Sequence, residues 1–235
     1  MKTIIIILTT FIFSSFCKSQ EKQDNSQNNG YLVFSGGASF PSGQFSEASS
    51  LAAAKDGVYF SILFEKPEFN NFGYIASAFS QIIPIDKESI ATYYGTKNSG
   101  TWTVDGKNWV TGGAMVGGYV FYPFDAKNIL SIEARVMIGG IYISMPDVTY
   151  KQTGTTRTDE LTGGIGGSFA YQLGTGFRIN ASTSICFMIN FDFIGSTFNY
   201  EAFSGSSNIG QIYNVEKSSQ PVNTLNLSFG VGFIL

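Results

Sequence analysis

Five charged residues stand out because each falls on the polar side of a segment in which apolar and polar residues alternate. In an extended strand, successive side chains point to opposite faces, so these five should occupy one enclosed polar face. Isolated charges are costly away from water, and acids and arginines that are enclosed together should therefore pair. The five residues are Glu65, Glu133, Arg135, Arg178 and Asp192.

The spacing of the segments predicts which of these charges meet. If the hairpins are centred in the intervening loops, Arg135, Ala170 and Asp192 should be neighbours across three strands. The residues one step away would be Glu133, Gln172 and Asn190. The interpretation that we favour is a structural polar network that fills a narrow interior and fixes strand register. The other interpretation is a charged constriction that selects ions or small solutes.

Catalysis would have to rely on carboxylates, because the chain contains no histidine. That absence excludes a Ser–His hydrolase arrangement and the usual zinc ligand sets. Two acid pairs remain, Asp159 with Glu160 in a loop and Glu133 with Asp192 on the enclosed face, and neither has a spacing that singles it out. The sequence therefore predicts no enzyme activity, no catalytic residue, no cofactor and no metal site.

Aromatic side chains gather in the predicted connection 84–109. Tyr93, Tyr94, Trp102 and Trp109 stand there among Gly, Ser, Thr and Lys, a mixture that suits a binding surface. Tryptophans are also frequent where strands leave a bilayer. We favour the anchor interpretation for Trp102 and Trp109, and both interpretations stay open for the two tyrosines. The candidate contacts with a ligand are Tyr93, Tyr94 and Trp102.

Strands are the elements that would position these residues. Between Ser184 and Ile194, apolar residues alternate without interruption with largely polar ones. Similar alternation, diluted in places by glycine, predicts about eight strands. Their ranges are 30–40, 57–65, 72–82, 110–122, 129–144, 161–179, 184–200 and 222–235. Several are longer than strands of globular proteins usually are, and long enough to cross a bilayer at a tilt.

The predicted connections alternate in length along the chain. Those after the second, fourth and sixth strands are short, whereas the other four are long. The long connections are 41–56, 84–109, 145–160 and 202–221. This alternation is typical of membrane barrels, which have short turns on the periplasmic side and long loops outside.

Composition agrees with a surface that faces lipid. Charged residues make up 13% of the 235 residues, about half the usual share, and aromatic residues make up 15%. The net charge of −3 and the lack of a basic cluster argue against a nucleic-acid partner. Residues 1–19 are predicted to be a signal peptide, 20–29 a disordered lead-in and 30–235 the barrel. The predicted fold is all-β, an antiparallel up-and-down transmembrane β-barrel of about eight strands.

On these residues the chain resembles the small outer-membrane β-barrel family of Gram-negative bacteria, with a layout similar to eight-stranded barrels of the OmpA/OmpX type. The segments that carry the resemblance are 36–45, 117–140, 169–182 and 225–235. The resemblance implies an outer-membrane location with both termini in the periplasm, contact with outer-membrane lipid, and insertion by the barrel-assembly machinery. Phe229 and Phe233 match the aromatic last strand that this machinery recognises, whereas Leu235 replaces the usual terminal Phe.

The function that fits these observations best is a structural or surface role in which the long loops contact ligands or partners. A small passive pore is one alternative, although an eight-stranded interior is just wide enough for side chains to fill. The other alternative is a secreted, soluble β-sandwich that binds a sugar or a protein.

Overall fold

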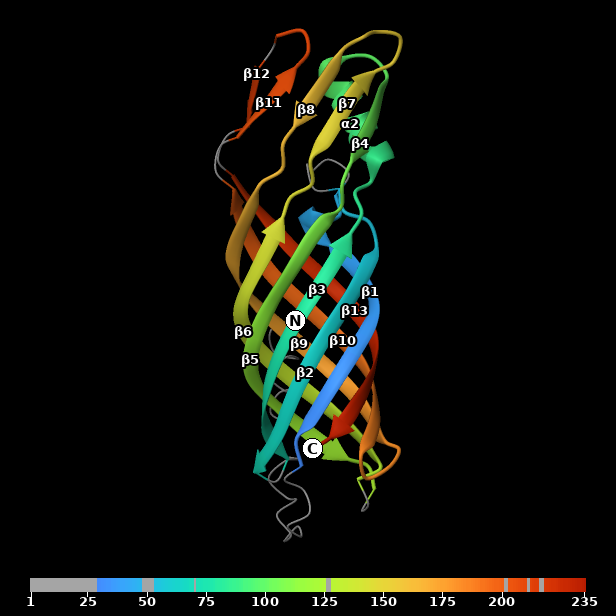
Figure 1. Cartoon of the computed structure of the whole chain (residues 1–235), viewed down its shortest axis with the longest axis vertical. Coiled ribbons are helices and arrows are strands. Elements are labelled where there is room, and N and C mark those ends of the chain that lie inside the picture. The colour runs from blue at the N-terminus through green and yellow to red at the C-terminus, as the bar shows by residue number, and fades with distance from the viewer. Residues whose placement is uncertain are drawn as a thin grey trace, which may run out of the picture.

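The structure, a computed structural model, describes residues 29–47, 53–69, 71–125, 128–200, 203–210, 212–215 and 218–235. Within these residues, eight antiparallel strands close a barrel in the order β1-β13-β10-β9-β6-β5-β3-β2 (Figure 1). They are β1 (Tyr31–Ser42), β2 (Gly57–Phe69), β3 (Phe72–Ile83), β5 (Trp109–Pro123), β6 (Leu130–Ser144), β9 (Ile165–Asn180), β10 (Ile185–Tyr200) and β13 (Ser218–Ile234). The predicted up-and-down barrel is confirmed, and the predicted strand ranges lie within four residues of these bounds. The predictions for residues 1–19 and 20–28 lie outside the described residues.

The strands point their apolar side chains outward. On β10, Phe191 is 56% exposed and Ile189 is 40% exposed, whereas Asn190 and Asp192 are buried inside the ring. The same division holds on β2, where Phe60 is exposed on the outer face. A closed ring with an apolar outer face must be solvated by lipid rather than water, because a soluble sheet buries its apolar face. The soluble β-sandwich alternative is therefore wrong.

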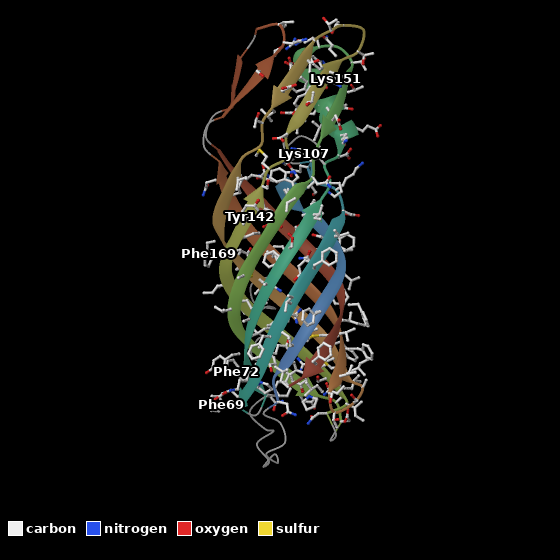
Figure 2. The ribbon with its side chains drawn as sticks, in the orientation of Figure 1. Phe69, Phe72, Lys107, Tyr142, Lys151 and Phe169 are labelled. Atoms are coloured by element: carbon white, nitrogen blue, oxygen red, sulfur yellow. The ribbon has the colours of Figure 1, made fainter. Side chains whose placement is uncertain are left out.

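Aromatic side chains frame the apolar face at two heights. Phe69 and Phe72 lie near the lower end of the barrel in Figure 2, and Tyr142 and Phe169 lie nearer the upper end. The exposed Tyr122 on β5 lies opposite Ile132 on β6, and the exposed Tyr142 lies ten residues further along β6. Tyr122 and Tyr142 thus mark the two heights. Ten residues of a strand tilted by about 40° rise roughly 25 Å along the barrel axis. That height matches the apolar band of a membrane barrel.

The two ends of the barrel differ. At one end, which we call the turn end, short connections follow β2, β5 and β9, and the C-terminus lies there as well (Figure 1). At the other end, which we call the cap end, all the long connections gather. The first of them begins with a 3-10 helix, η2 (Gly43–Phe45).

Three of the four long connections, those after β3, β6 and β10, contain regular strands, and together they form a structure that we call the cap. Five short strands make a second sheet in the order β12-β11-β8-β7-β4 above the barrel (Figure 1). They are β4 (Trp102–Gly106), β7 (Val148–Gln152), β8 (Thr158–Leu161), β11 (Phe203–Ser207) and β12 (Ile212–Val215). A helix, α2 (Lys87–Asn98), packs against β4. Among the described residues, no helix is long and apolar enough to span a bilayer.

Helix α2 is an element that the all-β prediction lacked. Asp86 precedes it, and its carboxylate accepts hydrogen bonds from the backbone N–H of Ser89 at 3.1 Å and from the Ser89 hydroxyl at 2.9 Å. Such an N-cap satisfies a backbone donor that the first turn of a helix leaves unpaired. The connection between β3 and β5 therefore contributes an ordered helix to the cap.

Candidate functional site

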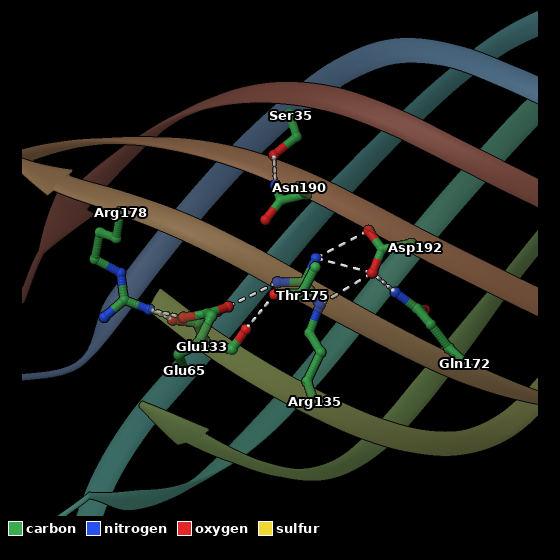
Figure 3. Close-up of polar contacts among 9 residues, drawn as sticks. All are labelled: Ser35, Glu65, Glu133, Arg135, Gln172, Thr175, Arg178, Asn190 and Asp192. Atoms are coloured by element: carbon green, nitrogen blue, oxygen red, sulfur yellow. Dashed lines mark hydrogen bonds and ion pairs between the residues drawn. The ribbon is translucent and has the colours of Figure 1, made fainter. Parts of the chain in front are cut away.

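The centre of the lumen holds a group of paired charges and amides, the lumen network, drawn in Figure 3. Arg135 on β6 donates from Nε to Oδ1 of Asp192 at 3.0 Å and from its terminal nitrogen to both carboxylate oxygens at 2.8 and 2.9 Å. Its other terminal nitrogen donates to Glu133 at 2.7 Å. Gln172 donates to Oδ1 of Asp192 at 2.8 Å. The guanidinium of Arg135 and the carboxylate of Asp192 are thus fully engaged and buried.

Arg178 forms the end of this network nearest the turns. One terminal nitrogen of its guanidinium pairs with both Glu65 and Glu133, which connects β9 to β2 and β6 across the lumen (Figure 3). The ring of Tyr31 stacks on the guanidinium at 4.0 Å. Glu133 therefore bridges the two arginines, and all five charged residues named from the sequence belong to one connected group.

Two glycines on β9 make room for the network. Gly174 pairs in register with both Arg135 and Asp192, and Gly176 occupies the next inward position. A Cβ atom on Gly174 would lie 2.1 Å from Oδ1 of Asp192. The expectation that Ala170 lies between the two charges is wrong. The registers of β9 with both neighbours differ from the predicted ones by four residues, an even number that leaves every side chain on its predicted face.

A second, uncharged polar cluster lies closer to the cap end. Its centre is Gln81, whose amide nitrogen donates to three acceptors and whose amide oxygen accepts from Thr111 at 2.6 Å. The three acceptors are Ser39, Thr224 and Asn226. The bonds to these three acceptors join β3 to β1 and β13, which are not its neighbours in the barrel, whereas Thr111 lies on the adjacent strand β5. Gln81 is 1% exposed. The alternation of β3 places Gln81 inward, but its partners depend on registers that the sequence does not specify.

An apolar plug closes the lumen at the cap end. Phe45, from η2, packs edge-on against the inward ring of Trp109 with a centroid distance of 5.4 Å. The side chains of both residues are at most 1% exposed, and Ile83 and Ile143 are fully buried as well. Side chains thus fill the lumen at three levels: the charged network, the Gln81 cluster and this plug.

In the cap, an aromatic cluster joins α2 to the sheet. The ring of Tyr94 stacks on Tyr150 at 4.0 Å and meets Trp102 edge-on at 4.9 Å. Its hydroxyl donates to Asp159 at 2.8 Å. Arg157 lies 5.1 Å above the Trp102 ring and pairs with Asp159 at 3.0 Å. The cluster gives the cap an interior of its own, separate from the barrel.

The charge of Asp159 is stabilised within this cluster. Burial alone would raise the pKa of Asp159, but hydrogen bonds from Ser207, Arg157 and Tyr94 outweigh that effect and hold the pKa below its usual value. In the same cluster, burial raises the pKa of Tyr150 to about 12. Asp159 is therefore a structural anion, and its neighbour Glu160 is exposed. The structure does not bring these two adjacent acids into a shared site.

The structure corrects the anchor interpretation of both tryptophans. Trp102 is 4% exposed inside the cap and Trp109 is 1% exposed inside the lumen, so neither lies at a membrane interface. The alternation of β5 places Trp109 inward, and helix α2, which was not predicted from the sequence, covers Trp102. Burial also removes Trp102 as a direct ligand contact. Tyr94 is engaged within the same cluster, whereas Tyr93 is half-buried on α2 with Lys97 at 5.8 Å from its ring.

Three features that matter to these sites were missed from the sequence. They are the plug residue Phe45, the space that Gly174 leaves between Arg135 and Asp192 because it has no side chain, and helix α2. A signal for α2 exists, because Asp86 is followed by Lys87, Glu88 and Ser89, a typical helix start. Nothing in the local sequence marks Phe45, which lies outside the alternating segments.

Among the residues that the structure describes, no group of three or more potential ligand side chains is placed to hold a metal ion. No protein-family model matches the chain, and no curated protein matches it.

Solved structures with a similar fold are outer-membrane and surface proteins. The attachment invasion locus protein Ail of Yersinia pestis is 11% identical with a TM-score of 0.45, and the match covers 88% of this chain and 99% of that one. Neisserial surface protein A is 12% identical with a TM-score of 0.45, covering 88% and 97%. A major outer membrane protein from Thermus thermophilus is 13% identical with a TM-score of 0.48, covering 88% and 99%. The likeness is one of fold, and the transmembrane barrel architecture follows from the closed ring and its apolar face.

Proposed function

We propose that the chain is an outer-membrane protein with a closed lumen that presents its cap outside the cell to ligands or partners. The observation that carries this proposal is the ordered cap itself. Fixing one residue of a chain costs roughly 1–2 kcal/mol of conformational entropy, so an ordered segment has to be stabilised by its contacts. The short turns after β2, β5 and β9 show that a few residues are enough to join two barrel strands. A sheet, a helix and a buried aromatic cluster beyond the membrane are thus not needed to close the barrel.

The lengths of the connections support one orientation in the membrane. Membrane barrels place short turns in the periplasm and long connections outside, which supports a cap end on the exterior and both termini in the periplasm. Outer-membrane lipid would contact the apolar face between the aromatic residues. Phe229 and Phe233 face outward on the last strand, which supports recognition by the barrel-assembly machinery during insertion.

The filled lumen favours this role over a passive pore. Arg135 and Asp192 are both at most 3% exposed, and their paired charges occupy the centre of the barrel. Conduction would require the lumen network, the Gln81 cluster and the plug to open together. The absence of enzyme activity stays a prediction.

Surface labelling tests the orientation. Cys186 is a free, buried cysteine, and it is replaced by serine in the parent of both labelling variants. In this background, Lys151→Cys places a thiol in the cap and Thr183→Cys places one in the turn between β9 and β10. Both native side chains are exposed, so neither substitution should disturb packing. A membrane-impermeant maleimide added to intact cells should label the cap cysteine alone, and the turn cysteine only after the outer membrane is permeabilised. The opposite pattern would overturn the proposed orientation.

Planar bilayer recording tests the closed lumen. The purified barrel should produce no stable conductance steps, because the paired charges and the plug block the path. Reproducible steps from the heat-modifiable, folded species would contradict the closed lumen and favour the pore.

A further inference from the structure

The lumen network contains more acids than bases. Among the described residues, the charged side chains buried inside the barrel are three carboxyls and two guanidiniums, each at most 3% exposed. They are Glu65, Glu133, Arg135, Arg178 and Asp192. If every carboxyl were ionised, the network would carry one excess negative charge. A charge that is enclosed away from water without a counter-charge is so costly that the group neutralises instead. The network should therefore hold one proton.

Two of the three carboxyls are placed to stay ionised. Both oxygens of Asp192 accept N–H groups of Arg135, at 2.8 and 2.9 Å, and Gln172 donates a further hydrogen bond at 2.8 Å. Arg135 also donates to one oxygen of Glu133 at 2.7 Å, and Arg178 donates to the other. Donors on cations that engage both oxygens of a carboxyl stabilise its ionised form. Neither Asp192 nor Glu133 is therefore the place for the proton.

Glu65 has fewer partners than the other two acids. Its Oε2 pairs with Arg178, whereas its Oε1 has no hydrogen-bond partner among the described residues. The carboxyl of Glu65 also lies within hydrogen-bond reach of the carboxyl of Glu133. Two ionised carboxylates have no hydrogen to place between them, so this contact requires that one of the two is a carboxylic acid. Carboxyls that meet at such close range share one proton for the same reason in the aspartic proteases.

We infer that the lumen contains a proton lock, in which Glu65 is a neutral carboxylic acid that donates a hydrogen bond to the Glu133 carboxylate. With the proton in place, the two side chains attract each other and, through Arg178, tie β2 to β6 and β9. Without it they repel each other at the same point, so the loss of one proton weakens the ties among three strands. Arg178 lines a cavity of about 470 Å³ that opens at the turn end, which places the lock at the end of the network nearest to solvent.

The other titratable and charged groups around Glu65 come from several strands. Its register partner on β1 is Tyr31, and its register partner on β3, Ile75, is apolar. The remaining groups are Tyr119 on β5, Glu133 and Arg135 on β6, Arg178 on β9 and Cys186 on β10. Phenols and thiols lose their protons in alkaline solution, and guanidiniums keep theirs. In acidic to neutral solution, the carboxyls are therefore the groups of this set that can exchange a proton.

Carboxyl ¹³C NMR tests where the proton lies. The full-length mature protein, labelled at its glutamate and aspartate carboxyl carbons, would be folded in detergent micelles, and the Glu65 signal identified by its loss in Glu65→Gln. At neutral pH the Glu65 carboxyl carbon should resonate in the range of protonated carboxyls, and those of Glu133 and Asp192 in the range of carboxylates. An ionised Glu65 at neutral pH would overturn the proposal, and so would a proton on Glu133 or Asp192 instead.

The pH dependence of urea unfolding provides a second test. Glu65→Gln replaces the acid with a neutral amide of the same shape. The folded parent holds a proton that the unfolded chain releases above the ordinary carboxyl value of about 4.3, so the stability of the parent should fall as the pH rises. Between about pH 5 and about pH 7, the unfolding constant of the parent relative to that of Glu65→Gln should rise about tenfold per pH unit. A ratio that stays constant over this range would overturn the lock.

Two substitutions serve as matched controls. Glu160→Gln makes the same chemical change at an exposed position in the cap, so the ratio of its unfolding constant to that of the parent should not depend on pH. Asp192→Asn removes a carboxylate that Arg135 engages fully, and it should make unfolding easier at neutral pH, opposite to the effect of Glu65→Gln. If Glu65→Gln also unfolded more readily than the parent at neutral pH, Glu65 would be a paired anion and the lock would be overturned.

Discussion

Arg135 and Asp192 meet across an intervening strand, because Gly174 lies between them and has no side chain. Gly174 is the register partner of Arg135 on one side of β9 and of Asp192 on the other. A Cβ atom at this position would lie 2.1 Å from Oδ1 of Asp192 and 2.7 Å from Nε of Arg135. The central contact of the lumen network therefore depends on a residue that carries no charge.

Gly174→Ala should destabilise the barrel, because the added methyl group must displace a buried ion pair. We expect a loss of about 1–3 kcal/mol in the free energy of unfolding, as for other overpacked interiors. Urea unfolding in lipid vesicles would measure it. Gly140→Ala is the control, since a Cβ atom on Gly140 has nothing within 4 Å on the outer face. Equal effects of the two substitutions would contradict the proposed role of the gap at Gly174.

The pairing itself predicts that two substitutions are not additive. Arg135→Ala leaves Asp192 buried without its partner and should cost about 3–5 kcal/mol. In a chain that already carries Asp192→Asn, the same change should cost at least about 1 kcal/mol less, because no unpaired carboxylate remains at that position.

A double-mutant cycle from urea unfolding measures this difference. Lys107 and Asp147 form a comparison pair at 2.8 Å in the cap, with side chains 78% and 47% exposed. That cycle should be additive, because exposed ion pairs contribute little. Additive behaviour at Arg135 and Asp192 as well would show that their contact adds nothing to stability.

How far the sequence predicts this site depends on the level of structure. Alternation places Glu65, Arg135 and Asp192 on the inner face, because the side-chain period of a strand is fixed by its backbone. It does not say which residues are opposite each other, since that depends on where each connection turns. The long connection between β6 and β9 and the short turn between β9 and β10 are both centred later in the chain than predicted, so Gly174 rather than Ala170 separates the two charges.

The cap lies beyond what alternation can predict. Its strands have four or five residues, too few for a periodic signal, and α2 is stabilised by contacts with strands distant in the sequence. Trp102 illustrates the consequence. An aromatic residue among Gly, Ser, Thr and Lys suggests an exposed anchor, and only the helix that covers it makes it an interior residue.

The facing of β10 predicts unequal effects at adjacent positions. Ile189→Arg places a charge on the lipid face and should cost roughly 2–4 kcal/mol and impair insertion. Asn190→Ser, one residue away in the lumen, should be far milder, since it leaves a polar group beside Ser35, the present partner of Asn190 at 3.3 Å. The fraction of heat-modifiable protein on electrophoresis and the urea midpoint would report both effects. If both variants inserted and unfolded like the parent, the assigned faces of β10 would be wrong.

The stability of the cap should depend on one hydroxyl. Tyr94→Phe removes the hydrogen bond to Asp159 and retains the ring stack on Tyr150. A hydrogen bond to a charged group contributes about 1.5–3 kcal/mol, so amide exchange in β7 and β8 should rise tenfold or more while β10 is unaffected. Tyr93→Phe, the adjacent change on the same helix, should alter neither.

The effect of Tyr94→Phe should also depend on pH. Because the pKa of Asp159 is lowered in the folded cap, its contribution is complete above the ordinary carboxyl pKa of about 3.9 and is lost as the pH falls through the lowered value. The difference between Tyr94→Phe and the parent, expressed as protection factors, should therefore be large at neutral pH and shrink once Asp159 is protonated. A difference that persisted unchanged in strong acid would assign the effect to packing of the tyrosine rather than to its bond with the carboxylate.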